Sequence, residues 1–186
     1  MIGNIKKIEI MFTDTKLEVP YFSQYLEVDN KENCLKACGM TCVYMVLKYN
    51  HMEIETLDNM VLEGIDTGGF GISGWSHDYF VDLFIKLGFE SERKESMRNN
   101  DVTMIQENIL NGYPVIVSAE RILFDKKIFH QVLLTGIRQD DKGNLEGFFY
   151  HDPASLQPEL ATHCYVPIKT FFLSWRKMAI FAKKKQ

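Results

Sequence analysis

One stretch near the amino end, residues 33–49, limits what this chain can fold into. It reads NCLKACGMTCVYMVLKY, with apolar residues at helical spacing from Met40 to Tyr49 and nothing to break a helix before Asn50. We therefore expect a buried helix with Cys38 in its first turn. Backbone N–H groups and the helix dipole favour a thiolate at that position, which makes Cys38 a candidate nucleophile. The alternative is that Cys38 only packs, as most cysteines on apolar helices do.

Composition indicates one folded domain over residues 1–186, with residues 1–16 as a possible amino-terminal extension or edge strand. A chain of 186 residues that is 46% hydrophobic can build a single packed core. The net charge of -4 offers no general basic surface for nucleic acid, and the basic residues 183–185 are expected to form a solvated end. No apolar run suits a signal sequence or a membrane span. We expect a soluble, cytoplasmic protein with no membrane partner.

Three of the four cysteines, at positions 34, 38 and 42, are four residues apart. On one helix they would share a face, but helical Cβ directions are wrong for disulfide bonds. A zinc site that adds His163 or Cys164 is conceivable, although structural zinc normally uses short cysteine knuckles on turns. We expect no metal and no cofactor, and a thiol-based redox or metal protein remains as an alternative.

The rest of the chain divides into a helical first half and a strand-rich second half. Such a division argues for an α+β fold with an antiparallel sheet. Besides the helix of Cys38, the expected helices are 54–62, 75–87, 102–110 and 168–175. The expected strands are 5–12, 89–93, 114–119, 130–137, 145–151, 165–166 and 178–182. We also expect an extended segment at 17–24, a loop at 29–33 and a hairpin turn at 140–144.

Residues 65–74, IDTGGFGISG, form a glycine-rich stretch that lacks the motif of a phosphate-binding loop. It is either a mobile surface loop or the lip of a binding cleft. In the second case Gly69 and Trp75 are candidate substrate-binding residues. His77, in the first turn of the next expected helix, is expected at the surface or as a cap.

Thiol acyl chemistry needs a nucleophile, an imidazole, a polar group that orients the imidazole, and donors for an oxyanion. The chain can supply these as Cys38, His130, Asp152 and Gln24. His130 begins one strand and Asp152 follows its hairpin partner, so the hairpin would bring the two side by side.

Each assignment has a competitor. Cys34 would be the reactive thiol if the helix began earlier, whereas Cys42 is expected in the core. Neighbouring side chains of a strand point to opposite faces, so His151 should face away from the site. Asp152, which precedes a proline, is alternatively only a turn residue, and Gln24 is alternatively a loop cap.

Several segments together resemble the C39-like cysteine peptidases, a branch of the papain-like superfamily. These segments are VPYFSQ (19–24), CGMTCVYMVLKY (38–49), NGYPVIV (111–117), HQVLLTGI (130–137), HDP (151–153) and a terminal F-x₃-W at Phe171 and Trp175. The resemblance implies a papain-like fold with the nucleophile helix packed on a carboxyl-terminal sheet. It also implies that Cys38 is the nucleophile, His130 the general base and acid, and Asp152 the orienter. Gln24 would donate to the oxyanion beside the backbone N–H of Cys38.

Two positions depart from the family pattern. Met40 replaces a common Pro or Ala, and Gln131 replaces a common aromatic residue after the histidine. Gln131 would line the cleft and is therefore a candidate substrate-binding residue. Members that process double-glycine leader peptides are fused to a transporter's membrane domain, and we do not expect that role for this chain.

The resemblance and the residues together predict a cysteine peptidase-like hydrolase. It would cleave a peptide or small amide substrate through a thiol acyl-enzyme. The alternatives are an acyltransferase or amidase on the same scaffold, or a non-catalytic peptide-binding module.

Overall fold

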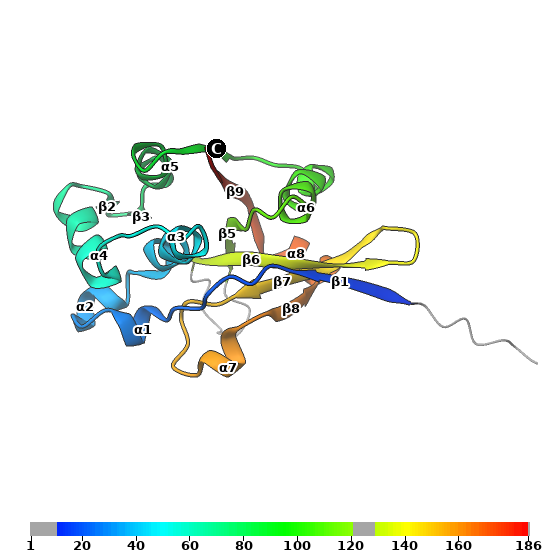
Figure 1. The fold of residues 1–186 in the computed structure, drawn as a ribbon, viewed down its shortest axis with the longest axis horizontal. Helices are drawn as coiled ribbons and strands as arrows, with labels where there is room; N and C mark the ends of the chain where they lie inside the picture. The colour runs from blue at the N-terminus through cyan, green and yellow to red at the C-terminus, as the bar shows by residue number, and fades with distance from the viewer. Residues whose placement is uncertain (1–10, 121–128, 186) are drawn as a thin grey trace, which may run out of the picture.

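The computed structural model describes residues 11–120 and 129–185 as an antiparallel sheet with helices packed on both faces (Figure 1). This arrangement confirms the α+β architecture expected from the sequence. Most of the strand expected at 5–12 lies outside the described residues. The first described strand, β1 (Phe12–Lys16), runs antiparallel to the far half of the long strand β6.

Within the part of the chain that the structure describes, the main sheet has seven strands, and every neighbouring pair in it is antiparallel. Across the sheet the order is β4 (Phe89–Lys94), β9 (Trp175–Lys184), β5 (Val115–Glu120), β6 (Phe129–Asp140), β7 (Leu145–His151) and β8 (Cys164–Pro167). Strand β5 pairs with the first half of β6 and β1 with its second half, while β7 lies along the other edge of β6. Strand β6 is therefore the strand around which the sheet is built.

The helices and a small hairpin fill the intervals between these strands. They are α1 (Gln24–Glu27), α2 (Lys31–Cys34), α3 (Cys38–Tyr49), α4 (Leu57–Asp66), α5 (His77–Lys86), α6 (Val102–Leu110), α7 (Pro158–Ala161), α8 (Ile168–Ser174), the 3-10 turn Asn99–Asp101 and the hairpin of β2 (Phe70–Gly71) and β3 (Gly74–Trp75). Within the described ranges, no helix has the length and apolar character that crossing a bilayer requires.

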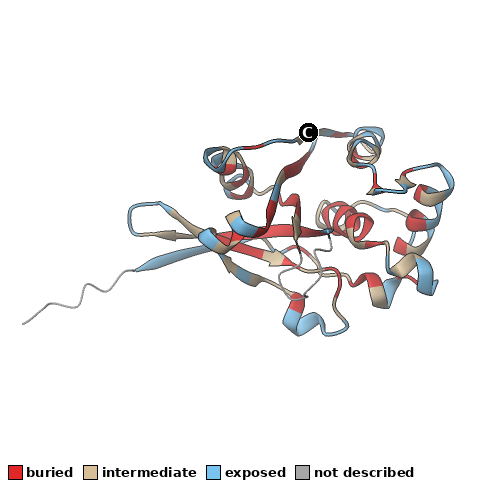
Figure 2. Cartoon of the chain, turned by 180° about the vertical axis from the view of Figure 1, so that it is seen from behind, coloured by how far each residue is buried: buried red, intermediate tan, exposed pale blue. Residues whose placement is uncertain are grey.

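Helix α3 is the most deeply buried helix of the fold, with every residue from 39 to 47 buried. Figure 2 shows buried residues gathered on this helix and along the central strands. At its start, a Cβ on Gly39 would collide with the side chain of Gln131 and with the ring of Phe80. The glycine after Cys38 therefore lets the first turn of α3 lie directly against β6.

Alternate residues of the central strands enter two hydrophobic cores on opposite faces of the sheet. Leu133 of β6 packs with α3 and α5, whereas Val132 and Leu134 pack with α6 and α8. This alternation is the ordinary consequence of strand geometry. It also places His130 on the face of Val132 and Leu134, and Gln131 on the face of α3.

The observed elements confirm most of the expected ones, including α3, α6 and β7. Three local predictions were wrong. The expected loop at 29–33 contains α2, because the side chain of Asn30 caps two N–H groups of that helix. The helix expected at 54–62 begins after its cap Thr56 and extends to Asp66. The glycine-rich stretch is not a simple loop, because its second half forms the β2–β3 hairpin. The short helix α7 was not expected.

Candidate active site

Cys38 is the first residue of α3 and is partly exposed. Cys34 ends the separate helix α2, so one helix does not cover all three cysteines and they do not share a helical face. Cys42, one turn into α3, is fully buried. All four thiols are free, and the described residues contain no group of three side chains arranged to hold a metal ion.

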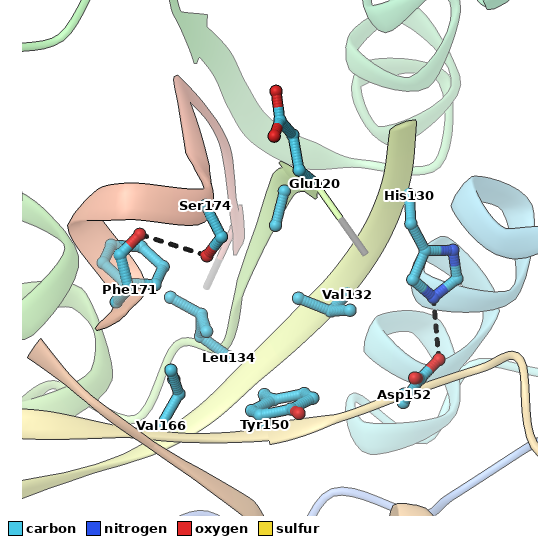
Figure 3. A pocket seen from close by; sticks show the side chains of 10 residues that line it. Glu120, His130, Val132, Leu134, Tyr150, Asp152, Val166, Phe171 and Ser174 are labelled. Carbon is cyan, nitrogen blue, oxygen red and sulfur yellow. Dashed lines mark hydrogen bonds and ion pairs between the residues drawn. The ribbon is translucent and has the colours of Figure 1, made fainter. Parts of the chain in front are cut away.

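The β6–β7 hairpin brings His130 and Asp152 together. Figure 3 shows the two side chains pointing toward one another, and His130 Nε2 lies 2.7 Å from Asp152 Oδ1. The same carboxylate oxygen accepts a hydrogen bond from the backbone N–H of Ala154 at 2.8 Å. Asp152 is thus both a turn residue and a partner of the imidazole, so the two sequence interpretations do not exclude each other.

The other side of the His130 ring faces Cys38. The two side chains are hydrogen-bonded, and since Nε2 is engaged by Asp152, Nδ1 is the nitrogen left for the thiol. Burial alone would raise the pKa of the Cys38 thiol. The hydrogen bond and charge of His130 outweigh burial, with help from backbone hydrogen bonds at Gln131 and Gly39, and the pKa is lowered.

The pKa of His130 shifts in the opposite direction to that of Cys38. Burial would lower the pKa of His130, but hydrogen bonds to Asp152 and Cys38 raise it to about 9. A lowered thiol pKa beside a raised imidazole pKa favours a thiolate–imidazolium pair at neutral pH. Such a pair is the reactive form of a nucleophilic cysteine.

Gln24 contacts the segments next to Cys38 and Asp152, and its side-chain amide points at Cys34. Its side chain is 2% exposed, and Nε2 donates to the carbonyl of Cys34 at 2.6 Å. Its backbone N–H donates to the carbonyl of Pro153 at 2.9 Å, which ties it to the turn that follows Asp152. Gln24 does not appear in the lining of the groove at Cys38. An amide nitrogen carries two hydrogens, and Cys34 uses one of them.

His151 is not part of this arrangement. It is fully buried; its Nε2 lies 2.9 Å from the carbonyl oxygen of Val19, and its Nδ1 accepts from the backbone N–H of His163 at 3.1 Å. Both ring nitrogens are therefore used away from the thiol. This is the orientation that strand alternation predicts for the neighbour of Asp152.

A groove of about 200 Å³ leads to Cys38 and His130. Trp75 and Gln131 line it, as expected, and Trp75 is fixed there because its Nε1 donates to the carbonyl of Lys36 at 2.6 Å. Gly69 does not line it. That residue is buried against the ring of Tyr79, so the structure argues against a substrate-binding role for Gly69.

The 65–74 stretch, offered above as the possible lip of a cleft, contributes Phe70, Ser73 and Gly74 to the groove. Sequence reasoning missed the other lining residues, which are Leu35, Lys36, His77, Ser118, Phe129 and Arg176. They come from the connection between α2 and α3, the start of α5 and the strands β5, β6 and β9. Only the spatial meeting of these segments identifies them, because no motif connects them in the sequence.

A second, smaller cavity of about 70 Å³ lies on the other side of the His130–Asp152 pair. Its walls are mainly apolar and include Val132, Leu134 and Phe171 (Figure 3). In the same view the carboxylate of Glu120 points away from these apolar side chains. An apolar cavity beside the His130 imidazole offers space for an aliphatic group.

Comparison with solved structures shows the same fold in several proteins, two of which are described as a protease or a peptidase. A double glycine motif protease from an AMS/PCAT transporter, solved in complex with the leader peptide, is 18% identical, with a TM-score of 0.60, and covers 91% of this chain and 94% of its own. A protein described as a C39-like peptidase from Bacillus anthracis is 16% identical, with a TM-score of 0.61, and covers 92% and 99%. UfSP from C. elegans is 12% identical, with a TM-score of 0.59, and covers 98% of this chain and 36% of its own.

The sequence itself gives the family. No curated protein matches it at a significant level. The model of the Peptidase_C39 like family matches residues 16–181, which is most of the chain and includes both Cys38 and the β6–β7 hairpin. With its papain-like fold, this chain therefore belongs to the Peptidase_C39 like family.

Proposed function

We propose that this protein is a cysteine peptidase that cleaves a peptide or small amide through a thiol acyl-enzyme. The observation that carries the proposal is that His130 interacts with both Asp152, through Nε2, and Cys38, and that Cys38 and His130 both line an open groove. A histidine held in this way stabilises a thiolate and stores the proton that a leaving amine needs.

In the first step the Cys38 thiolate attacks the carbonyl carbon, and the carbonyl π electrons move to the oxygen. The backbone N–H of Cys38 and the second amide hydrogen of Gln24 would stabilise that oxyanion. When the intermediate collapses, the C–N bond breaks and the amine takes the proton of the His130 imidazolium. The neutral imidazole then removes a proton from water, which attacks the acyl-enzyme and releases the acid and the thiolate.

A peptide is the substrate class best supported by the surroundings. The groove is open along several segments, and one structural relative was solved with a leader peptide bound. The apolar cavity beside His130 would take an aliphatic side chain of the same substrate. An amine or alcohol acceptor in place of water would turn the same acyl-enzyme into a transferase.

The test is product analysis by mass spectrometry after incubation with a mixed library of short peptides. We expect cleavage products together with an acyl adduct on Cys38 that survives an acid quench. Cys38→Ala should abolish both, whereas Cys34→Ala, which removes the thiol at the end of α2, should keep both. Turnover that persists in Cys38→Ala, or a library that gives neither product nor adduct, would refute the proposal.

A further inference from the structure

The groove that leads to Cys38 has an unusual charge for this protein. The whole chain carries a net charge of -4, yet the lining includes Lys36, His77 and Arg176, and among residues 11–120 and 129–185 no Asp or Glu lines it. Burial lowers the pKa of His77, whose ring lies 3.7 Å from the carboxylate of Glu95, so His77 adds little positive charge to the groove. Lys36 and Arg176 therefore dominate the electrostatic potential inside it.

Arg176 is positioned by groups that leave its charge uncompensated. Its guanidinium carbon lies 3.6 Å from the centre of the Phe129 ring, and Nη1 donates to the hydroxyl of Ser118 at 3.3 Å. These contacts orient the side chain toward the groove and use few of its five N–H donors.

Two other arginines of the chain, unlike Arg176, are paired with carboxylates. Arg138 makes two hydrogen bonds to the carboxylate of Asp14, at 2.7 and 2.8 Å, and Arg93 lies 2.7 Å from Asp78. Among residues 11–120 and 129–185, no ion pair involves Arg176. A guanidinium that is held in place without a carboxylate is ready to bind one from outside.

Lys36 contributes the second cation from the helical side of the groove. Its Nζ lies 5.6 Å from the centre of the Phe70 ring, and its backbone carbonyl is fixed by Trp75. Within the described chain it too has no ion-pair partner. Lys36 and Arg176 therefore reach the same groove from different parts of the fold, with Cys38 also in its lining.

We propose that Arg176, assisted by Lys36, binds a carboxylate of the substrate, so that this protein selects acidic peptides. The carboxylate is either an Asp or Glu side chain near the cleaved bond or the free carboxyl end of a short peptide, since both offer the same planar anion. Arg176 is then a specificity-determining residue. The inference rests on the proposed thiol chemistry at Cys38 and names the substrate class for it.

The test uses iodoacetyl probes that alkylate Cys38 and differ by a single charge. Iodoacetyl-glutamate α-amide carries a side-chain carboxylate, iodoacetyl-glutamine carries a terminal one, and iodoacetyl-glutamine α-amide is neutral. Peptide mapping gives the rate at Cys38 for each. We expect one charged probe to react roughly 3- to 10-fold faster than the neutral probe at low salt, and the faster of the two identifies the source of the carboxylate.

The variant Arg176→Gln should remove this preference, so that the charged probes react with Cys38 no faster than the neutral probe. Lys177→Gln is the matched control, because it makes the same charge change one residue away. Lys177 donates to Asn99 Oδ1 at 2.7 Å and is absent from the groove lining, so its variant should keep the preference. Equal rates for all three probes on the native protein, or a preference that survives Arg176→Gln, would overturn the inference.

A separate measurement keeps this inference distinct from the proposed function. The Cys38→Ala variant can bind acetyl-Gly-Glu-Gly-amide and acetyl-Gly-Gln-Gly-amide, and acetyl-Gly-Gln-Gly with a free carboxyl end, without any chemistry, and NMR titration gives their affinities. If an acidic peptide binds more tightly and Arg176→Gln cancels the difference, the inference holds even where Cys38 proves unreactive. If Cys38 reacts as a thiolate and all three peptides bind equally, the proposed function stands and the inference fails.

Discussion

His130 Nε2 lies 2.7 Å from Asp152 Oδ1, although the two residues are 22 positions apart in the sequence. The β6–β7 hairpin produces this contact, because His130 begins one strand and Asp152 directly follows the other. The carboxylate is itself fixed by the backbone N–H of Ala154. The imidazole is therefore held in one orientation before any substrate arrives, and its other nitrogen is presented to Cys38.

The thiolate–imidazolium pair predicts a distinctive pH dependence for alkylation. The pKa of the Cys38 thiol is lowered, so we expect iodoacetamide to react with Cys38 well below the ordinary thiol pKa of about 8.5. Peptide mapping of the alkylated protein between pH 5 and pH 9, on the order of one point per half unit, would locate the midpoint. Reaction of Cys34 before Cys38 at the acidic end would contradict the assignment.

Removing the His130 imidazole should raise the pH at which Cys38 is alkylated. In His130→Ala the hydrogen bond and charge that lower the thiol pKa are gone, and burial, which raises it, remains. We therefore expect the midpoint for Cys38 to move above about 8.5. Peptide cleavage should fall by roughly 100-fold or more, since the proton donor for the leaving amine is lost.

Asp152→Asn should lower the upper pH limit of peptide cleavage. Asp152 raises the pKa of His130, which reaches about 9, so the neutral amide should lower it. The imidazolium then loses its proton at a lower pH, and the alkaline limb of the rate profile moves toward neutrality. NMR titration of the His130 ring checks this directly. The asparagine oxygen can still accept from Ala154, so melting temperature should change little; an unmoved alkaline limb would show that Asp152 only shapes the turn.

Local sequence signals were enough to predict the helix of Cys38 and the hairpin of His130 and Asp152. Each is one continuous segment whose periodicity or turn chemistry lies in neighbouring residues. Arg176 could not be found in this way. It enters the groove through the pairing of β5 with β9, where Trp175 lies opposite Ala119, and that register depends on the whole sheet. Gly69 lies outside the groove lining because it is buried against Tyr79, next to the hairpin of residues 70–75, and this placement also depends on the folded chain.

The oxyanion role of Gln24 predicts a loss of turnover without a loss of thiol reactivity. Removing one oxyanion donor lowers kcat by roughly 100- to 1000-fold in enzymes of this chemistry. Gln24→Ala should show that fall, while Cys38 should alkylate at the native rate, because alkylation forms no oxyanion. The lost hydrogen bond to Cys34 should also cost about 1 to 3 kcal/mol of unfolding free energy. Equal losses in cleavage and in alkylation would mean that Gln24 only supports the fold.

Replacing Gly39 should lower the stability of the protein and, through packing, disturb the contact of Cys38 with His130. A methyl group there would meet the Gln131 side chain and the Phe80 ring, so Gly39→Ala should push α3 away from β6 and cost about 1 to 3 kcal/mol of unfolding free energy. Gly71→Ala is the matched control, since a Cβ at Gly71 has no heavy atom within 4 Å. Denaturant unfolding compares the two variants. Because Cys38 is hydrogen-bonded to His130 on β6, the same displacement should raise the midpoint for Cys38 alkylation in Gly39→Ala alone. A normal midpoint in a destabilised Gly39→Ala protein would show that the thiol–imidazole contact does not depend on the close packing of α3.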